Sequence, residues 1–126
     1  MSKKSKALRF NTGKPKWGLI DFKSLEPLIR VLEYGAHKYS LYLKNGKKVY
    51  GKDIPFKDRG KYKLLKSGND NWKAGLNRTE VLESAMRHLA AIMDGEKYDN
   101  ESGIDHMGHV MCNALFHIYF ESNGKY

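Results

Sequence analysis

Residues 99–113 combine side chains that bind metal ions and transfer protons. This segment holds two aspartates, a glutamate and two histidines, and it ends on an asparagine, whereas an ordinary solvated helix face carries mostly lysine, arginine and glutamate. Carboxylate and imidazole groups at this density indicate a site for a divalent metal ion or for phosphate chemistry.

The spacing within this segment predicts a polar stripe on a helix. Asp105, His109 and Asn113 are spaced i, i+4 and i+8, which stacks their side chains along one side, and Glu101 lies one turn earlier. The alternative is that the acids only favour the positive end of the helix. His106 and His117 fit structural roles better than ligand roles.

One helix cannot surround an ion, so neighbouring helices must supply further ligands. Glu83 is the candidate on the preceding helical segment, and Arg87 follows it one turn later. Glu33 and His37 repeat this spacing near the start of the chain. The alternative for Glu83 and Arg87 is an ion pair on a wet surface.

Several other chemistries lack their sequence signatures. A zinc site is disfavoured because the chain has one cysteine and no HExxH motif. The His-Asp dipeptide of HD-type phosphohydrolases is absent, and so are P-loop and dinucleotide-binding glycine motifs. Cys112 lacks a catalytic context, and we expect it in the core.

Hydrophobic periodicity predicts three helices, over residues 25–38, 78–95 and 102–121. Ser24 and Asn77 are the expected N-caps of the first two, and Gly95 is the expected stop of the second. The expected buried face of the second helix is Leu82, Ala85, Met86, Leu89, Ile92 and Met93. That of the third is Ile104, Met107, Val110, Met111, Ala114, Leu115 and Ile118.

Residues 40–70 form a basic insertion with a hairpin signature. Asn45–Gly46 separates two strand-like runs within 41–50, and 57–66 is a further basic and aromatic run. The predicted fold is therefore mainly α with a small β-hairpin inserted at about residues 41–66. Aromatic rings among lysines can grip nucleic acid by stacking and charge. The alternative is a solvated hairpin whose tyrosines pack on the helices.

Positive charge is concentrated in the first part of the chain. Residues 1–76 hold 19 of the 23 lysines and arginines and 6 of the 14 acids, whereas residues 77–126 carry a net charge of −4. This division suits a nucleic-acid binder with an acidic tail, or an enzyme whose acids hold a metal while its bases hold a polyphosphate. A solubilising surface is the third possibility.

Length and composition indicate one folded domain, 1–126, without a membrane partner. The chain has 126 residues, a mean hydropathy of −0.66 and apolar runs far shorter than the roughly 20 residues of a membrane span. No apolar stretch of a signal peptide follows the basic start, and the single cysteine cannot form an internal disulfide. We therefore expect a cytoplasmic protein.

Six short motifs in order along the chain carry a family resemblance. They are Gly13–Lys14, 33–39 (EYGAHKY), 71–75 (NWKAG), 85–89 (AMRHL), Gly95–Glu96 with Asp99, and 101–106 (ESGIDH) with Asn113. Together they resemble the dATP/dGTP diphosphohydrolase family of phages and bacteria, which is related to the MazG-like all-α nucleoside triphosphate pyrophosphatases. The resemblance covers nearly the whole chain outside residues 40–70.

This resemblance implies a MazG-like helical bundle that hydrolyses a purine deoxynucleoside triphosphate to the monophosphate and pyrophosphate. It implies Mg²⁺ or Mn²⁺ as cofactor, assembly as a dimer or tetramer, and a phage-encoded or bacterial protein in the host cytosol. Two departures stand out. The pattern ExxE then ExxD of MazG-like enzymes becomes Glu80–Glu83 then Glu101–Asp105, one residue longer, and 31 residues separate motifs that lie close together in the family.

Wheel positions and motif matches together give the predicted site. The catalytic residues are Glu83, Glu101 and Asp105, and the metal ligands are these three with Glu33 and His109. The predicted substrate contacts are Lys14, Lys38, Trp72, Arg87, His88 and Asn113. Two other functions stay open: a basic nucleic-acid-binding module with structural acidic helices, and a catalytically inactive nucleotide-binding protein.

Overall fold

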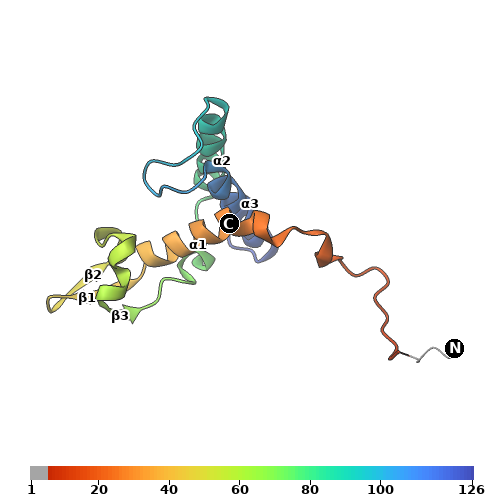
Figure 1. Cartoon of the computed structure of the whole chain (residues 1–126), viewed down its shortest axis with the longest axis horizontal. Helices are drawn as coiled ribbons and strands as arrows, with labels where there is room; N and C mark the ends of the chain where they lie inside the picture. Colours follow the sequence, from red (N-terminus) through yellow and green to blue (C-terminus); the bar gives the residue numbers. More distant parts are fainter. Residues whose placement is uncertain (1–5) are drawn as a thin grey trace.

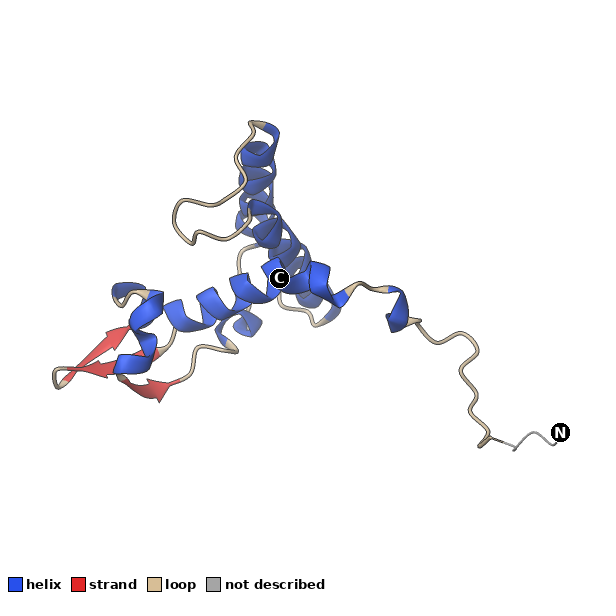
Figure 2. Cartoon of the chain, viewed as in Figure 1, coloured by secondary structure: helices blue, strands red, loops and turns tan. Residues whose placement is uncertain are grey.

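Three α-helices and one small antiparallel sheet make up the protein, as the computed structural model of residues 6–126 shows (Figures 1 and 2). The elements are α1 (Glu26–Lys38), β1 (Leu41–Lys44), β2 (Lys47–Tyr50), β3 (Lys63–Lys66), α2 (Arg78–Met93) and α3 (His106–Ser122). The prediction of a mainly α fold with an inserted hairpin is confirmed. Along residues 6–126, no helix combines the length and the apolar character that crossing a bilayer requires.

The ends of α2 follow their local sequence. The side chain of Asn77 accepts a hydrogen bond from the Glu80 amide at 3.1 Å, as expected of an N-cap. Gly95 adopts a φ of +91° just past the C-cap, a conformation that glycine accommodates without strain. At α1 the predicted cap is wrong: Leu25 holds the N-cap position, and the Ser24 hydroxyl donates to Asp21 instead.

The start of α3 differs from the prediction. Residues 99–105 form a loop in which Gly103 adopts a φ of +71° and the Asp99 amide donates to the carbonyl of Ile104 at 2.9 Å. The helix begins at His106, with Asp105 as N-cap accepting from the Met107 amide at 2.9 Å. Glu101 and Asp105 therefore do not lie on a helical stripe with His109.

The insertion is a three-stranded sheet in the order β2-β1-β3, with antiparallel pairing throughout. Asn45 and Gly46 both have positive φ, 51° and 77°, as a two-residue hairpin turn requires. Within the run 57–66 only β3 is a strand, because residues 56–61 form a 3₁₀ helix.

His37 anchors this insertion to α1. Its Nδ1 lies 2.8 Å from the Tyr42 hydroxyl and its Nε2 lies 2.7 Å from the carbonyl oxygen of Ile54. The side chain is buried, and its contacts are with the insertion. A histidine with both ring nitrogens satisfied can be buried without leaving an unpaired polar atom.

α3 is the central helix, because both α1 and α2 pack against it. α2 runs alongside α3, whereas α1 crosses it (Figure 1). The crossing is close at Gly108, where an added Cβ would lie 2.6 Å from the carbonyl oxygen of Pro27. Residues 6–25 extend away from the helices as an arm (Figure 1). The buried apolar side chains are Val31, Tyr42, Ile54, Val81, Cys112 and Phe120.

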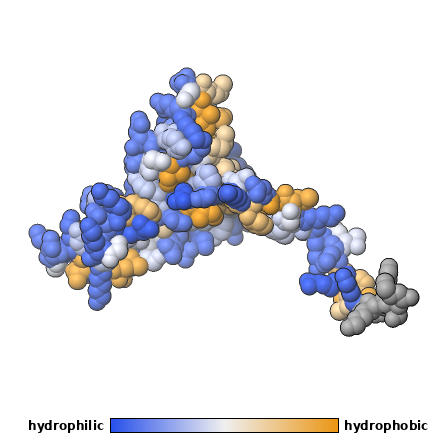
Figure 3. Space-filling view, viewed as in Figure 1, coloured by the Kyte–Doolittle hydropathy of each residue, from blue (hydrophilic) through white to orange (hydrophobic). Residues whose placement is uncertain are grey.

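The apolar faces predicted to be buried lie largely outside this core. Met86 is 67% exposed, Met93 82% and Ile118 63%, whereas His106 on the supposed polar face is buried. Apolar side chains consequently reach the surface along the α2–α3 pair (Figure 3). The histidines of α3 therefore face α1 and α2, whereas the apolar stripe of α3 faces outward.

Candidate functional site

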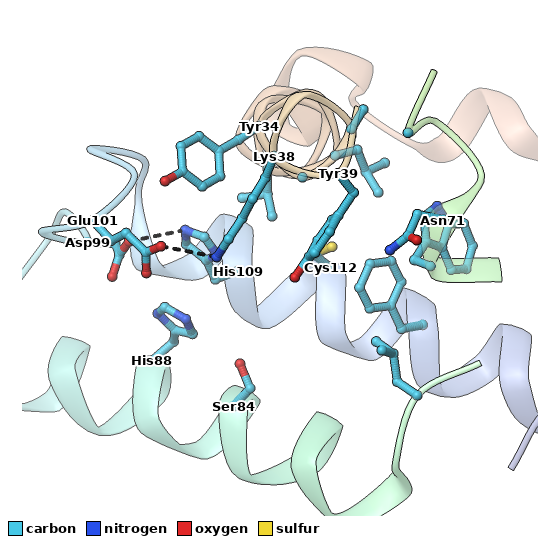
Figure 4. Close-up of a pocket in the computed structure, with 18 of the residues that line it drawn as sticks. Tyr34, Lys38, Tyr39, Asn71, Ser84, His88, Asp99, Glu101, His109 and Cys112 are labelled. Carbon is cyan, nitrogen blue, oxygen red and sulfur yellow. Dashed lines mark hydrogen bonds and ion pairs between the residues drawn. The ribbon is translucent and has the colours of Figure 1, made fainter. Parts of the chain in front are cut away.

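A cavity of about 540 Å³ lies between α1 and α2, with α3 as its floor (Figure 4). Its volume falls within the roughly 300–1,000 Å³ that is typical of small-molecule sites. The polar and charged residues that line it are Tyr34, Lys38, Tyr39, Asn71, Ser84, Arg87, His88, Asp99, Glu101, His106 and His109.

The two ends of the cavity differ in chemistry. Asp99, Glu101 and His109 gather at one end, and Asn71 lies at the other (Figure 4). Near Asn71, the ring of Trp72 stacks on that of Phe116, with centroids 4.6 Å apart and an angle of 21° between the planes. One end is therefore ionic and the other largely aromatic.

Three histidines from two helices meet at the ionic end. The Nδ1 atoms of His88 and His106 lie 2.9 Å apart, and the rings of His88 and His109 stack with centroids 4.3 Å apart and nearly parallel planes. Burial lowers the pKa of His88 and of His109 below the ordinary value for histidine. Both rings are therefore neutral at pH 7, with lone pairs free to bind a proton or a cation.

Asp99 is held among these histidines by Ser102. Its Oδ2 accepts hydrogen bonds from the Ser102 amide at 2.8 Å and from the Ser102 hydroxyl at 2.9 Å. That hydroxyl also lies 2.8 Å from Nε2 of His109. Burial raises the pKa of the Asp99 carboxyl, but the hydrogen bonds from Ser102 outweigh burial and leave that pKa below its ordinary value. Asp99 is thus an ionised, oriented carboxylate.

His106 is the most enclosed member of the cluster, with 7% of its side chain exposed. Within residues 6–126, its Nε2 has no hydrogen-bond partner, and it lies 3.5 Å from Oε2 of Glu96. An unpartnered buried nitrogen is costly and calls for an explanation. Sequence reasoning assigned neither Asp99 nor His106 to the site, because the helical wheel continued through the loop that contains Asp99.

Positive charge lines the walls of the cavity. Nζ of Lys38 donates to Oε1 of Glu101 at 3.2 Å across the gap between α1 and the loop (Figure 4). Burial lowers the pKa of Lys38, but the hydrogen bond to Glu101 and the negative charge of Glu101 together outweigh burial and raise that pKa above its ordinary value, so Lys38 stays charged. Arg87 lines the cavity from α2.

Other predicted site residues lie elsewhere. Glu83 is exposed on α2 and Lys14 lies on the arm, and neither lines this cavity. Glu33 and Asp105 line a separate depression, where Asp105 binds Nζ of Lys97 at 2.8 Å. Asn113 joins the two long helices through Ser84 Oγ at 3.1 Å. The functional roles of all these residues stay predictions.

Cys112 and Trp72 line the cavity, and each has a structural role there. Burial raises the pKa of the Cys112 thiol to about 12, so it remains protonated and is a poor nucleophile. Its place in the core is as predicted. Trp72, predicted to stack on a base, already has one face against Phe116.

The basic insertion leaves few aromatic faces free for nucleobases. Tyr42 is buried beneath His37, Arg59 covers the ring of Phe56 at 3.7 Å, and Lys44 lies 5.6 Å from the centroid of Tyr62. Tyr50 is exposed. Packing against the protein therefore accounts for most of these rings, and nucleic-acid binding by the insertion stays a prediction.

Comparison with known proteins places the chain in a family. The model of the N-terminal region of dATP/dGTP diphosphohydrolase matches residues 4–126. The chain belongs to the dATP/dGTP diphosphohydrolase family. A protein of Salmonella phage PMBT28 named dATP/dGTP diphosphohydrolase is 24% identical over 116 residues, which cover 92% of this chain. The chain spans 30% of that relative's length. No solved structure matches the chain.

In this diphosphohydrolase family member, the motifs that carried the resemblance converge on the cavity. Five of the six contribute a lining residue, and only Gly13–Lys14 does not. The five are spread from α1 to α3, and their residues meet only in the folded chain. The cavity is therefore the place where the sequence features of the family come together.

Proposed function

We propose that this chain hydrolyses a purine deoxynucleoside triphosphate of the dATP/dGTP type to the monophosphate and pyrophosphate. The observation that carries the proposal is the convergence of five separate motifs on one cavity with an ionic end and an aromatic end. The names of the family and of the phage relative support this substrate class.

A nucleotide would lie along the cavity with its triphosphate at the ionic end. Lys38 and Arg87 would neutralise phosphate oxygens and charge that develops during hydrolysis. Because Lys38 binds Glu101 across the cavity, phosphate would compete with Glu101 for Lys38. Tyr39 and Asn71 would contact the base or sugar at the far end.

A cation is needed at this end, since Asp99 and Glu101 would otherwise repel a triphosphate. The sequence assigned this cation to Glu83, Glu101, Asp105, Glu33 and His109. These side chains do not converge, since Glu83 is exposed outside the cavity and Glu33 and Asp105 line a separate depression. Ligand atoms of His88, Asp99 and His106 all lie within 4.8 Å of one another and fit a divalent ion such as Mn²⁺. When bound, such an ion supplies charge neutralisation and a more acidic water.

His109 and Ser102 would position the reacting groups. The hydrogen-bonded chain from Asp99 through Ser102 to His109 fixes the carboxylate and holds one imidazole nitrogen at a defined place. A neutral His109 can accept a proton from an attacking water. Burial at this end of the cavity strengthens each of these interactions.

The release of pyrophosphate from dNTPs tests the proposed hydrolysis directly. The purified chain is incubated with each of the four dNTPs and Mn²⁺ or Mg²⁺, and pyrophosphate and monophosphate are quantified. We expect release from dATP or dGTP, and little from the pyrimidine nucleotides. If the folded protein releases no pyrophosphate from any dNTP, the proposed hydrolytic activity is refuted. Nucleotide binding without release would point to an inactive nucleotide-binding protein, and salt-sensitive DNA binding without either would point to a nucleic-acid-binding module.

We also infer that the working protein is a homo-oligomer. A compact chain of 14.5 kDa exposes roughly 6,900 Å², whereas this one exposes 10097 Å². Part of the excess lies on the arm and part on the apolar side chains of α2 and α3. Obligate homodimers bury roughly 1,000–2,500 Å² on each chain, so an excess of about 3,000 Å² leaves room for such an interface as well as for the exposed arm. A second copy of the chain is the occupant that matches this surface, because the core of a single copy is small.

Replacing Ile118 by glutamate should break this assembly, since a charge would enter an apolar contact. Light scattering coupled to size exclusion should give a multiple of 14.5 kDa for the wild type and a lower mass for Ile118→Glu. Ile118→Leu, which keeps the side chain apolar, should assemble normally. A wild-type mass of 14.5 kDa would contradict the inference.

A further inference from the structure

We propose that His88, Asp99 and His106 form a centre for one divalent transition-metal ion, with clear preference over Mg²⁺. This inference deepens the proposed function, because the ion would lie in the same cavity, but it concerns ion binding and is measured without nucleotide. It replaces the ligand set expected from the sequence, which held four carboxylates and His109, with two imidazoles and one carboxylate.

The distances between the ligand atoms suit one ion. The Nδ1 atoms of His88 and His106 lie 2.9 Å apart. Two imidazole nitrogens bound to one ion at about 2.0–2.1 Å lie roughly 3 Å from each other. An Asp99 oxygen completes a group in which all ligand atoms lie within 4.8 Å. The pair of nitrogens is thus already at the separation that shared coordination requires.

The unpartnered nitrogen of His106 gives a second, independent indication. A neutral imidazole carries a single N–H, so only one of the two facing Nδ1 atoms can donate in the ion-free protein. If His106 donates, its buried Nε2 is left as a lone pair with no donor. An ion that takes both Nδ1 lone pairs leaves Nε2–H on His106, and Oε2 of Glu96 lies 3.5 Å from this nitrogen. Metal-bound histidines usually make this histidine–carboxylate contact.

The groups around the three ligands hold them in place. Ser102 fixes Oδ2 of Asp99 with two hydrogen bonds, so Oδ1 is the oxygen free to bind an ion. His109 stacks on the ring of His88 with an angle of 6° between the planes, which restricts the rotation of that ring. Such outer contacts orient ligands and raise the affinity for the metal.

The donor set decides which ions bind. Mg²⁺ prefers oxygen ligands and keeps several waters, whereas imidazole suits the later first-row divalent ions. Two histidines and one carboxylate also leave coordination positions open for water or phosphate oxygens. Mn²⁺, Fe²⁺, Co²⁺ and Zn²⁺ therefore fit this centre better than Mg²⁺.

Cobalt is the probe, because nitrogen-bound Co²⁺ absorbs visible light and Mg²⁺ is silent. The tag-free full chain is titrated with Co²⁺, and Zn²⁺ or Mg²⁺ is added in competition. We expect a visible band that saturates at one Co²⁺ per chain, disappears with equimolar Zn²⁺ and persists in a hundredfold excess of Mg²⁺. Affinity should fall by at least about 100-fold in His88→Gln and Asp99→Asn.

Matched controls distinguish Co²⁺ binding at the proposed centre from binding at other histidines, and loss of a ligand from loss of the fold. His117 lies outside the cavity and binds Tyr126 and Glu121, so His117→Gln should bind Co²⁺ as the wild type does. Circular dichroism checks that each variant is folded, and a substitution at half-buried His88 is safer for folding than one at buried His106. No band, a band retained in folded His88→Gln and Asp99→Asn, or displacement by equimolar Mg²⁺ would overturn the centre. Co²⁺ binding without dNTP hydrolysis would leave the centre standing and refute only the proposed function.

Discussion

Replacing Asp99 by asparagine should lower kcat for pyrophosphate release by about a thousandfold. The substitution keeps the size of the side chain but removes the negative charge that lies among His88, His106 and His109. That charge would hold the cation against the triphosphate and support proton transfer from water, effects that together are commonly worth about 10²–10⁴-fold. Steady-state kinetics with the preferred dNTP measures the loss.

Asp105→Asn is the matched control, since Asp105 is one of the three carboxylates that were predicted from the sequence to be catalytic. Asparagine is as good an N-cap as aspartate, so α3 should remain intact. We expect kcat to stay within about threefold of the wild type, because surface ion pairs such as that between Asp105 and Lys97 contribute little. A large loss in Asp105→Asn with normal activity in Asp99→Asn would return the site to the assignment made from the sequence.

Gly108→Ala should destabilise the fold by about 2–3 kcal/mol, because it overfills the crossing of α1 and α3. The new Cβ would lie 2.6 Å from the carbonyl oxygen of Pro27 and 2.8 Å from its carbonyl carbon. Backbone atoms cannot move aside as a flexible side chain would, so the two helices must separate. Urea unfolding followed by circular dichroism, at one protein concentration, gives the change in the free energy of unfolding.

Gly35→Ala tests whether any helical glycine would respond in the same way. Among the described residues, a Cβ at Gly35 meets nothing within 4 Å, and residue 35 lies inside α1, three residues before its end. Alanine should therefore stabilise the protein by about 0.5–1 kcal/mol through helix propensity. Equal effects of the two substitutions would mean that the crossing is not tight at Gly108.

Features set by a few neighbouring residues were predictable from the sequence. The Asn45–Gly46 turn, the cap from Asn77 to Glu80 and the stop at Gly95 each depend on backbone groups within three or four positions. The motifs also identified the family and named Lys38, Arg87 and His88, all of which line the cavity. Local chemistry and motif order thus determined the elements and the neighbourhood of the site.

The start of α3 shows where local reasoning failed. The apolar and polar periodicity continues through residues 102–105, and helical spacing fits it well. Residues 99–105 form a loop instead of a first helical turn, because the Asp99 carboxylate accepts hydrogen bonds from Ser102 and Gly103 adopts a positive φ. Asp99 thereby reaches the histidines, and Asp105 turns toward Lys97. Helical-wheel positions assume a continuous helix, so they could not have shown that Asp99, and not Asp105, lies beside the histidines.

The sequence by itself determined that α3 has an apolar face and a histidine-bearing face, but only the tertiary structure decided which face meets the rest of the chain. Periodicity records that a face needs burial and does not record the partner that buries it. Here α1 and α2 cover the histidines, because Gly108 lets α1 approach α3 closely on that side. His88 and His106, 18 residues apart, come within 2.9 Å only through this packing. The dense run of ligand-type residues is therefore a property of the sequence, and the centre that they form is a property of the fold.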